Sequence, residues 1–163
     1  KKQNLMIVSV IAVIAVIFVC VTNFQTVDEY YSDAEKPKEN IYGTVTISIS
    51  CETLIGKTDE AHIPSNGIIL KEVQCEIEKG DTVFDVISEI TAKNKIHMET
   101  NGNADMAYIQ GIGNIYEFDF GELSGWMYFV NGKEASVGCG EYVLQPNDKI
   151  EWKYTCEMGA DIQ

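Results

Sequence analysis

A long apolar segment near the N-terminus limits the fold of this chain more than any other feature. No charged residue lies between Lys2 and Asp28, and residues 5–21 read LMIVSVIAVIAVIFVCV. An α-helix rises about 1.5 Å per residue, so this run nearly covers a hydrocarbon core of about 30 Å. The segment therefore predicts a membrane-spanning helix over residues 1–22, and membrane contact through residues 5–22.

The charges around this segment predict its orientation. Lys1 and Lys2 precede it, and cytoplasmic flanks of spanning helices are enriched in such cations. A cleaved signal peptide is the main alternative, but its apolar region is usually shorter and ends in small residues. No A-x-A pattern follows here, and the branched Val19 before Cys20 argues against lipid attachment. We expect a retained anchor in the cell membrane, with everything after Thr22 extracytoplasmic.

Residues 23–40 read NFQTVDEYYSDAEKPKEN and show no apolar period, which is typical of a polar linker. The whole chain carries 25 acidic residues, 12 lysines and no arginine. After the first two lysines, 10 lysines face 25 acids, a net charge of −15. Such a surface repels nucleic acid phosphates and anionic lipid head groups, so neither is an expected partner of the domain.

The folded domain begins with alternating residues. Residues 44–51 read TVTISISC, with apolar and hydroxyl side chains in turn, which predicts a half-buried strand. A loop is expected over 52–66 and a second strand over 67–78. Thr82 and Asp85 have the spacing of a capping box at the start of a helix that ends near residues 93–95. The apolar stripe of this helix has helical spacing: Val83, Val86, Ile87 and Ile90.

Short strands are expected after the helix, around residues 106–110 and 115–118. The segment 126–133 reads WMYFVNGK and carries a hairpin signal. Asn131 and Gly132 both accept positive φ angles, so a tight type I′ turn is expected there.

The end of the domain predicts one more pair of strands. Residues 140–144 form the first, a turn follows over 145–148, and residues 149–156 form the second. The second strand places four residues on one face: Ile150, Trp152, Tyr154 and Cys156. Many short strands and one helix predict an α+β domain over residues 41–159, followed by a tail over 160–163.

Four cysteines lie in the domain, and cysteines of an exported chain form disulfides more often than metal sites. Four cysteines allow three connectivities, and the predicted final hairpin favours the one that pairs Cys139 with Cys156 and leaves Cys51 to pair with Cys75 on neighbouring early strands. Free cysteines are the alternative if the organism lives anaerobically. No C-x-x-C spacing occurs, so the sequence predicts no metal site.

Three groups of motifs carry a resemblance to a known family. They are GDTVFDV at 80–86, SGWMY at 124–128 with VNG at 130–132, and YVL at 142–144 with NDKIEWKYTC at 147–156. Together they resemble the transcobalamin-type C-terminal domain, which is frequent in surface proteins of Gram-positive bacteria. The resemblance covers roughly residues 42–159. It implies a β-grasp-like fold with short antiparallel strands and one packed helix.

The same resemblance suggests a ligand. In the animal vitamin B12 carriers, this domain closes over cobalamin that is bound to a larger helical-barrel domain. This sequence does not include such a barrel, so the resemblance implies that a second cobalamin-binding protein or domain completes the site.

Five residues are candidate ligand contacts, since aromatic rings stack on flat ligands: Trp126, Tyr128, Asn131, Tyr142 and Trp152. The alternative is that the aromatic residues, with Tyr154, form the core and that Asn131 only forms a turn. No catalytic constellation is present in the sequence, so we do not expect an enzyme.

Two hypotheses follow. The first is a membrane-anchored ligand-binding module that contributes to cobalamin or corrinoid binding with a partner. The second is a surface interaction or adhesion module with no small ligand. A concave aromatic pocket favours the first, and buried aromatic side chains favour the second.

Overall fold

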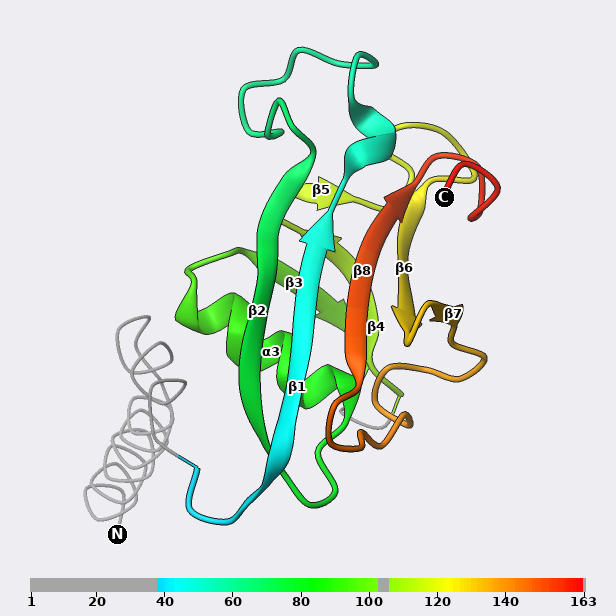
Figure 1. Ribbon diagram of the computed structural model, residues 1–163. Coiled ribbons are helices and arrows are strands. Elements are labelled where there is room, and N and C mark those ends of the chain that lie inside the picture. The colour runs from blue at the N-terminus through cyan, green and yellow to red at the C-terminus, as the bar shows by residue number, and fades with distance from the viewer. Residues whose placement is uncertain (1–37, 103–105, 163) are drawn as a thin grey trace, which may run out of the picture. The chain divides into compact units, whose positions relative to one another are not determined.

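The structure, a computed structural model, describes residues 38–102 and 106–162 (Figure 1). The expected membrane helix and linker residues 23–37 lie outside this part of the chain. Within the described part, no helix has the length and apolar character needed to cross a membrane.

The described residues of the domain form two sheets and one α-helix, which is consistent with the expected α+β class (Figure 1). The large sheet has the order β2-β1-β8-β6-β7 and the small sheet the order β3-β4-β5. The strands of the large sheet are β1 (Ile41–Ser50), β2 (Ile68–Glu78), β6 (Gly125–Val130), β7 (Lys133–Glu134) and β8 (Lys149–Thr155). The remaining elements are β3 (Met98–Asn101), β4 (Tyr108–Ile112), β5 (Ile115–Tyr116), the helix α3 (Val83–Lys93) and a 3₁₀ turn, η1 (Glu52–Leu54). The helix and the small sheet lie behind the large sheet in the view of Figure 1.

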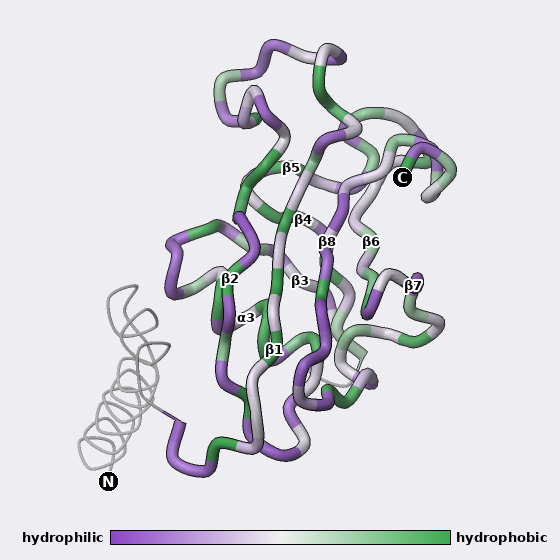
Figure 2. Tube along the Cα trace, in the orientation of Figure 1, coloured by the Kyte–Doolittle hydropathy of each residue, from purple (hydrophilic) through white to green (hydrophobic). Residues whose placement is uncertain are grey.

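The local predictions for β1, α3 and the β6–β7 hairpin are confirmed. Apolar residues alternate with threonine and serine along residues 44–50 of β1, and the apolar Val45, Ile47 and Ile49 are buried (Figure 2). The capping box is present, because Thr82 Oγ1 accepts from Asp85 N at 3.2 Å and Asp85 Oδ2 accepts from Thr82 N at 2.8 Å. Asn131 and Gly132 have φ angles of 54° and 74°, as a type I′ turn requires.

The centre of the large sheet departs from the expected antiparallel pattern. Strands β1 and β8 pair in parallel, from Thr46 opposite Lys149 to Ser50 opposite Lys153. Strand β8 pairs on its other edge with β6, antiparallel. Alternation along a strand predicts which side chains are buried but carries no information about the partner or its direction.

The expected strand over residues 140–144 is wrong. This segment instead runs beside the start of α3, where Tyr142 O accepts from Val83 N at 3.1 Å and Leu144 N donates to Asp81 O at 2.9 Å. Val143 in this segment forms an isolated antiparallel β-bridge with Thr82. The first N–H groups of a helix have no partner within the helix, and here Tyr142 O and Cys139 O accept from Val83 N and Phe84 N.

The four cysteines of the domain are free thiols in this structure. Cys51 follows the last residue of β1, and its N–H donates to Gly67 O, just before β2 begins. Cys75 lies on β2 opposite Val45, and Val45 is six residues before Cys51 along the chain. Six residues of strand span about 20 Å, and a disulfide needs Cα atoms within about 7 Å, so the expected Cys51–Cys75 bond does not fit this register. The hairpin that motivated a Cys139–Cys156 bond is absent among the described residues.

Candidate functional site

A hollow of about 190 Å³ lies between the two sheets. The large sheet supplies three aromatic side chains to its wall: Trp126 and Tyr128 from β6, and Trp152 from β8. The opposite wall consists of residues 107–109 at the start of β4 and residues 137–139 of the loop after β7. We call this the aromatic hollow.

The three aromatic side chains form the wall of the hollow on the side of the large sheet, and we call this wall the floor. Trp126, Tyr128 and Trp152 are 8%, 9% and 3% exposed and belong to the hydrophobic core. The rings of Tyr128 and Trp152 lie 5.2 Å apart at 31°, and Tyr128 OH donates to Val137 O at 2.6 Å. Burial raises the pKa of Tyr128, so this hydroxyl stays a donor at all ordinary pH values. The same hydrogen bond fixes the 137–139 loop over the floor.

The two indole groups differ in one respect. Trp126 Nε1 donates to Ile115 O at 2.8 Å, whereas Trp152 Nε1 is buried and has no acceptor in the described part of the chain. A buried donor without an acceptor costs about 1–3 kcal/mol, so such groups are rare in folded proteins. Trp152 therefore contributes to the wall of the hollow an indole whose N–H is buried and has no acceptor among the described residues.

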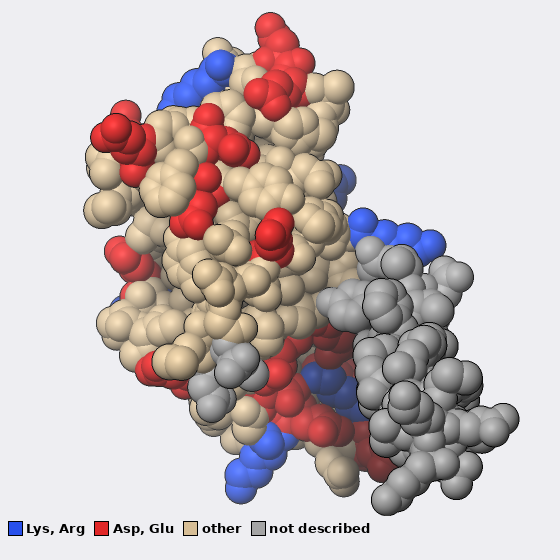
Figure 3. Space-filling model, turned by 180° about the vertical axis from the view of Figure 1, so that it is seen from behind, with Lys and Arg blue, Asp and Glu red and all other residues tan. Residues whose placement is uncertain are grey.

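The rim of the hollow is apolar and exposed. Tyr108 and Val137 line the hollow and are exposed, and Met106 is an exposed neighbour of Tyr108 in sequence. Tyr108 OH donates to Glu117 Oε2 at 2.6 Å, and burial followed by this contact raises the pKa of Tyr108 to about 12. Figure 3 shows the side of the domain that carries the small sheet, where a broad uncharged area lies among acidic side chains. Residues 41–159 contain 19 acidic residues and 8 lysines, a net charge of −11, and an apolar opening in such a domain suits a ligand with little negative charge.

Cys139 lines the hollow as an uncharged group. It is buried, and its thiol donates to Ala107 O at 3.4 Å. Burial raises the pKa of the thiol to about 11, so it remains protonated at neutral pH. Because the thiolate is the reactive form, Cys139 contributes packing and not a nucleophile.

The structure brings together three of the five residues predicted as ligand contacts. Asn131 does not line the hollow, and its side chain connects β6 to β8 through Asp148 Oδ1 at 2.7 Å and Lys149 N at 2.9 Å. Tyr142 packs edge-on against Tyr128, with ring centroids 6.3 Å apart, and is also absent from the lining. Sequence reasoning missed the β4 and 137–139 walls, because only the tertiary fold places them opposite β6 and β8.

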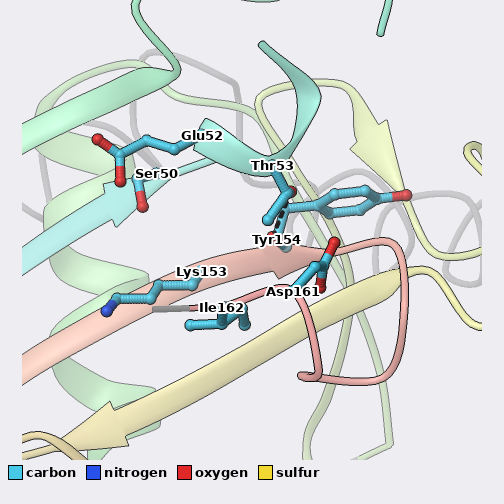
Figure 4. Close-up of a pocket in the computed structure, with 7 residues that line it drawn as sticks. All are labelled: Ser50, Glu52, Thr53, Lys153, Tyr154, Asp161 and Ile162. Carbon is cyan, nitrogen blue, oxygen red and sulfur yellow. Dashed lines mark hydrogen bonds between the residues drawn. The ribbon is translucent and has the colours of Figure 1, made fainter.

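A second hollow of about 200 Å³ lies at the C-terminal ends of β1 and β8 (Figure 4). Its lining combines Glu52 and Asp161 with Lys153, and Thr53 Oγ1 donates to Tyr154 O at 2.7 Å. In Figure 4 the ring of Tyr154 points away from this space. It offers mixed charges and no aromatic surface, so it is the weaker candidate for a site.

Comparisons with known proteins do not assign a function to this chain. Residues 80–156, slightly under half of it, match the family described as a domain of unknown function, DUF4430. No curated protein matches the chain.

Two solved structures are similar at low identity. Haptocorrin in complex with Cbi is 16% identical, with a TM-score of 0.49, over 74% of this chain and 27% of haptocorrin. A proposed metal binding protein from Ruminococcus gnavus ATCC 29149 is 10% identical, with a TM-score of 0.42, over 69% of this chain and 96% of that protein. The chain thus spans about a quarter of the length of haptocorrin.

Proposed function

We propose that this protein is a ligand-binding module of the cell surface, in which the aromatic hollow supplies one face of the binding site. The observation that carries the proposal is a hollow lined by three aromatic side chains of the large sheet, with the exposed Tyr108 at its rim. Ligand pockets typically have predominantly apolar and aromatic walls. The hollow has walls of this kind.

The size of the hollow supports a shared site. Pockets that enclose small molecules usually measure about 300–1,000 Å³, and this hollow measures about 190 Å³. A larger ligand would rest on the floor and on the exposed rim residues Tyr108 and Val137, with its other face uncovered. A second protein or domain would cover that face, and the isolated module would bind weakly because fewer contacts offset the cost of association.

We propose a corrinoid, such as cobalamin, as the ligand. The motifs SGWMY at 124–128 and NDKIEWKYTC at 147–156 support it through their resemblance to the transcobalamin-type domain. The strand order β2-β1-β8-β6, with β1 and β8 parallel, supports the β-grasp-like fold that this resemblance implies. In the same proposal, residues 5–22 anchor the protein in the membrane, the domain is extracytoplasmic, and it has no catalytic activity.

The test is a titration of the purified full-length protein in detergent with cyanocobalamin and with cobinamide, followed by tryptophan fluorescence. We expect weak, saturable binding that Tyr108→Ala reduces at least fivefold, because Tyr108 is 51% exposed on the rim. The matched control is Tyr42→Ala, because Tyr42 is 42% exposed and does not line the hollow. Equal losses in both variants would contradict the site, and sub-micromolar binding by the protein alone would contradict the shared-site argument.

The alternative is an interaction or adhesion module with no small ligand. The burial of Trp126, Tyr128 and Trp152 favours it, because buried rings contribute core packing whether or not a ligand exists. If a correctly folded protein binds neither corrinoid, with or without candidate partners, this alternative replaces the first.

A further inference from the structure

Three large apolar side chains project into solvent at one end of the domain. Phe118, Leu123 and Met158 are 63%, 53% and 69% exposed. Their segments are adjacent, because Met158 N donates to Leu123 O at 3.0 Å and Phe118 N donates to Ser124 O at 3.0 Å. We call these three residues the apolar tip.

The loop that carries the tip is held in place from within. Ser124 Oγ donates to Gly121 O at 2.8 Å and accepts from Phe120 N at 3.2 Å. Tyr154 OH donates to Ser124 Oγ at 3.0 Å, and the Phe120 ring packs edge-on against the Tyr154 ring. Phe120 therefore turns inward and anchors the loop. The exposure of Phe118 and Leu123 is a property of a fixed loop and not of a loose one.

The backbone at the tip is unusual for its residue types. Phe118 has a φ of 68° and Met158 a φ of 49°, in the left-handed region that large side chains rarely adopt. Such conformations persist where the surrounding structure imposes them, and they concentrate at functional sites. At Phe118 and Met158, a left-handed backbone therefore coincides with an apolar side chain that is exposed to water.

An exposed acidic residue lies directly beside each tip residue in the sequence. Asp119 follows Phe118, Glu122 precedes Leu123 and Glu157 precedes Met158. None of them takes part in an ion pair with another described residue. The tip also lies at the end of the sheet where β1 finishes, far from where residues 38–40 enter the domain (Figure 1). Strand β1 has ten residues, so the end of the sheet that carries the tip lies about 30 Å from the end where β1 begins.

We propose that the apolar tip is a docking surface for a partner protein that presents an apolar pocket rimmed by Lys or Arg. The three apolar side chains would fill the pocket, and the exposed carboxylates of Asp119, Glu122 and Glu157 would meet the cationic rim. Charge complementarity of this kind speeds association and selects the partner. An anionic membrane surface is a poor partner for the tip, because its head groups would repel the acidic residues beside the tip. This surface is separate from the aromatic hollow and does not depend on a corrinoid ligand.

The experiment places a photoreactive benzoylphenylalanine at position 118 of the full-length protein in cells, with the same residue at position 55 as the control. Ile55 is 55% exposed and belongs to η1's C-terminal flank, outside the tip. Cross-linked products are identified by mass spectrometry, and the affinity of the purified full-length protein for the identified protein is then measured. We expect one protein to cross-link from position 118 and not from position 55.

Two variants then test the chemistry. Phe118→Asn removes the ring but retains a residue that tolerates a left-handed backbone, and we expect at least a tenfold loss of affinity with an unchanged melting temperature. Ile55→Asn should leave the affinity unchanged. Higher salt should weaken binding, and Asp119→Asn with Glu122→Gln should reduce this salt dependence. The proposal is overturned if position 118 yields only lipid, a second copy of this chain or no product, or if the two Asn variants behave alike.

Discussion

Replacing Trp152 by Phe isolates the energetic effect of its unsatisfied indole N–H. The substitution removes a buried donor that has no described acceptor, which relieves about 1–3 kcal/mol. It also leaves a void of about 40 Å³, which costs about 1 kcal/mol at about 24 cal/mol per Å³. The relief offsets or exceeds the cavity cost, so Trp152→Phe should leave the free energy of unfolding unchanged or raise it by up to about 2 kcal/mol.

Trp126→Phe is the matched comparison. Trp126 is buried on the neighbouring strand and loses the same volume, but its Nε1 donates to Ile115 O at 2.8 Å. The substitution therefore leaves a buried carbonyl without its partner, which adds about 1–3 kcal/mol to the cavity cost. We expect Trp126→Phe to lower the free energy of unfolding by about 2–4 kcal/mol.

Urea denaturation of the two variants, followed by far-UV circular dichroism, measures the difference directly. Equal slopes against urea with different midpoints would show that stability, and not the denatured state, has changed. If Trp152→Phe destabilises as much as Trp126→Phe, then Trp152 Nε1 has a partner in solution and the argument for an unpaired donor fails. A stable Trp152→Phe protein with weakened corrinoid binding would instead connect the Trp152 side chain to the ligand.

Two further predictions concern the ends of the protein. The Asp161 carboxylate accepts hydrogen bonds from the Thr155 hydroxyl and from Cys156 N. Burial by itself would raise the pKa of this carboxyl group. The hydrogen bonds and the nearby Lys57 outweigh burial, so the pKa falls below its ordinary value of 3.8. The stability from this group is present at neutral pH and is lost as the pH drops below about 3.8, so wild type should lose more stability than Asp161→Asn in an acid titration of the melting temperature. At the other end, intact-mass measurement of membrane-extracted protein should find the anchor attached, and a mature N-terminus near Thr22 would contradict this prediction.

Short-range patterns in the sequence predicted the local elements. The alternation in residues 44–51, the Thr82–Asp85 capping box and the Asn131-Gly132 turn each depend on residues within a few positions of one another. Neighbouring residues determine such features because a helix start or a tight turn forms its hydrogen bonds over three or four residues. These predictions therefore needed no knowledge of the remaining chain.

Only the tertiary structure decided which segments meet. The parallel pairing of β1 with β8 joins residues about a hundred positions apart, and residues 140–144 pack beside the start of α3 instead of pairing with β8. The aromatic hollow likewise needs β4, β6, β8 and the 137–139 loop together. The sequence indicated that Trp126, Tyr128 and Trp152 were important, but burial and register determine whether an aromatic ring faces a ligand or the core, and both depend on the partner strand.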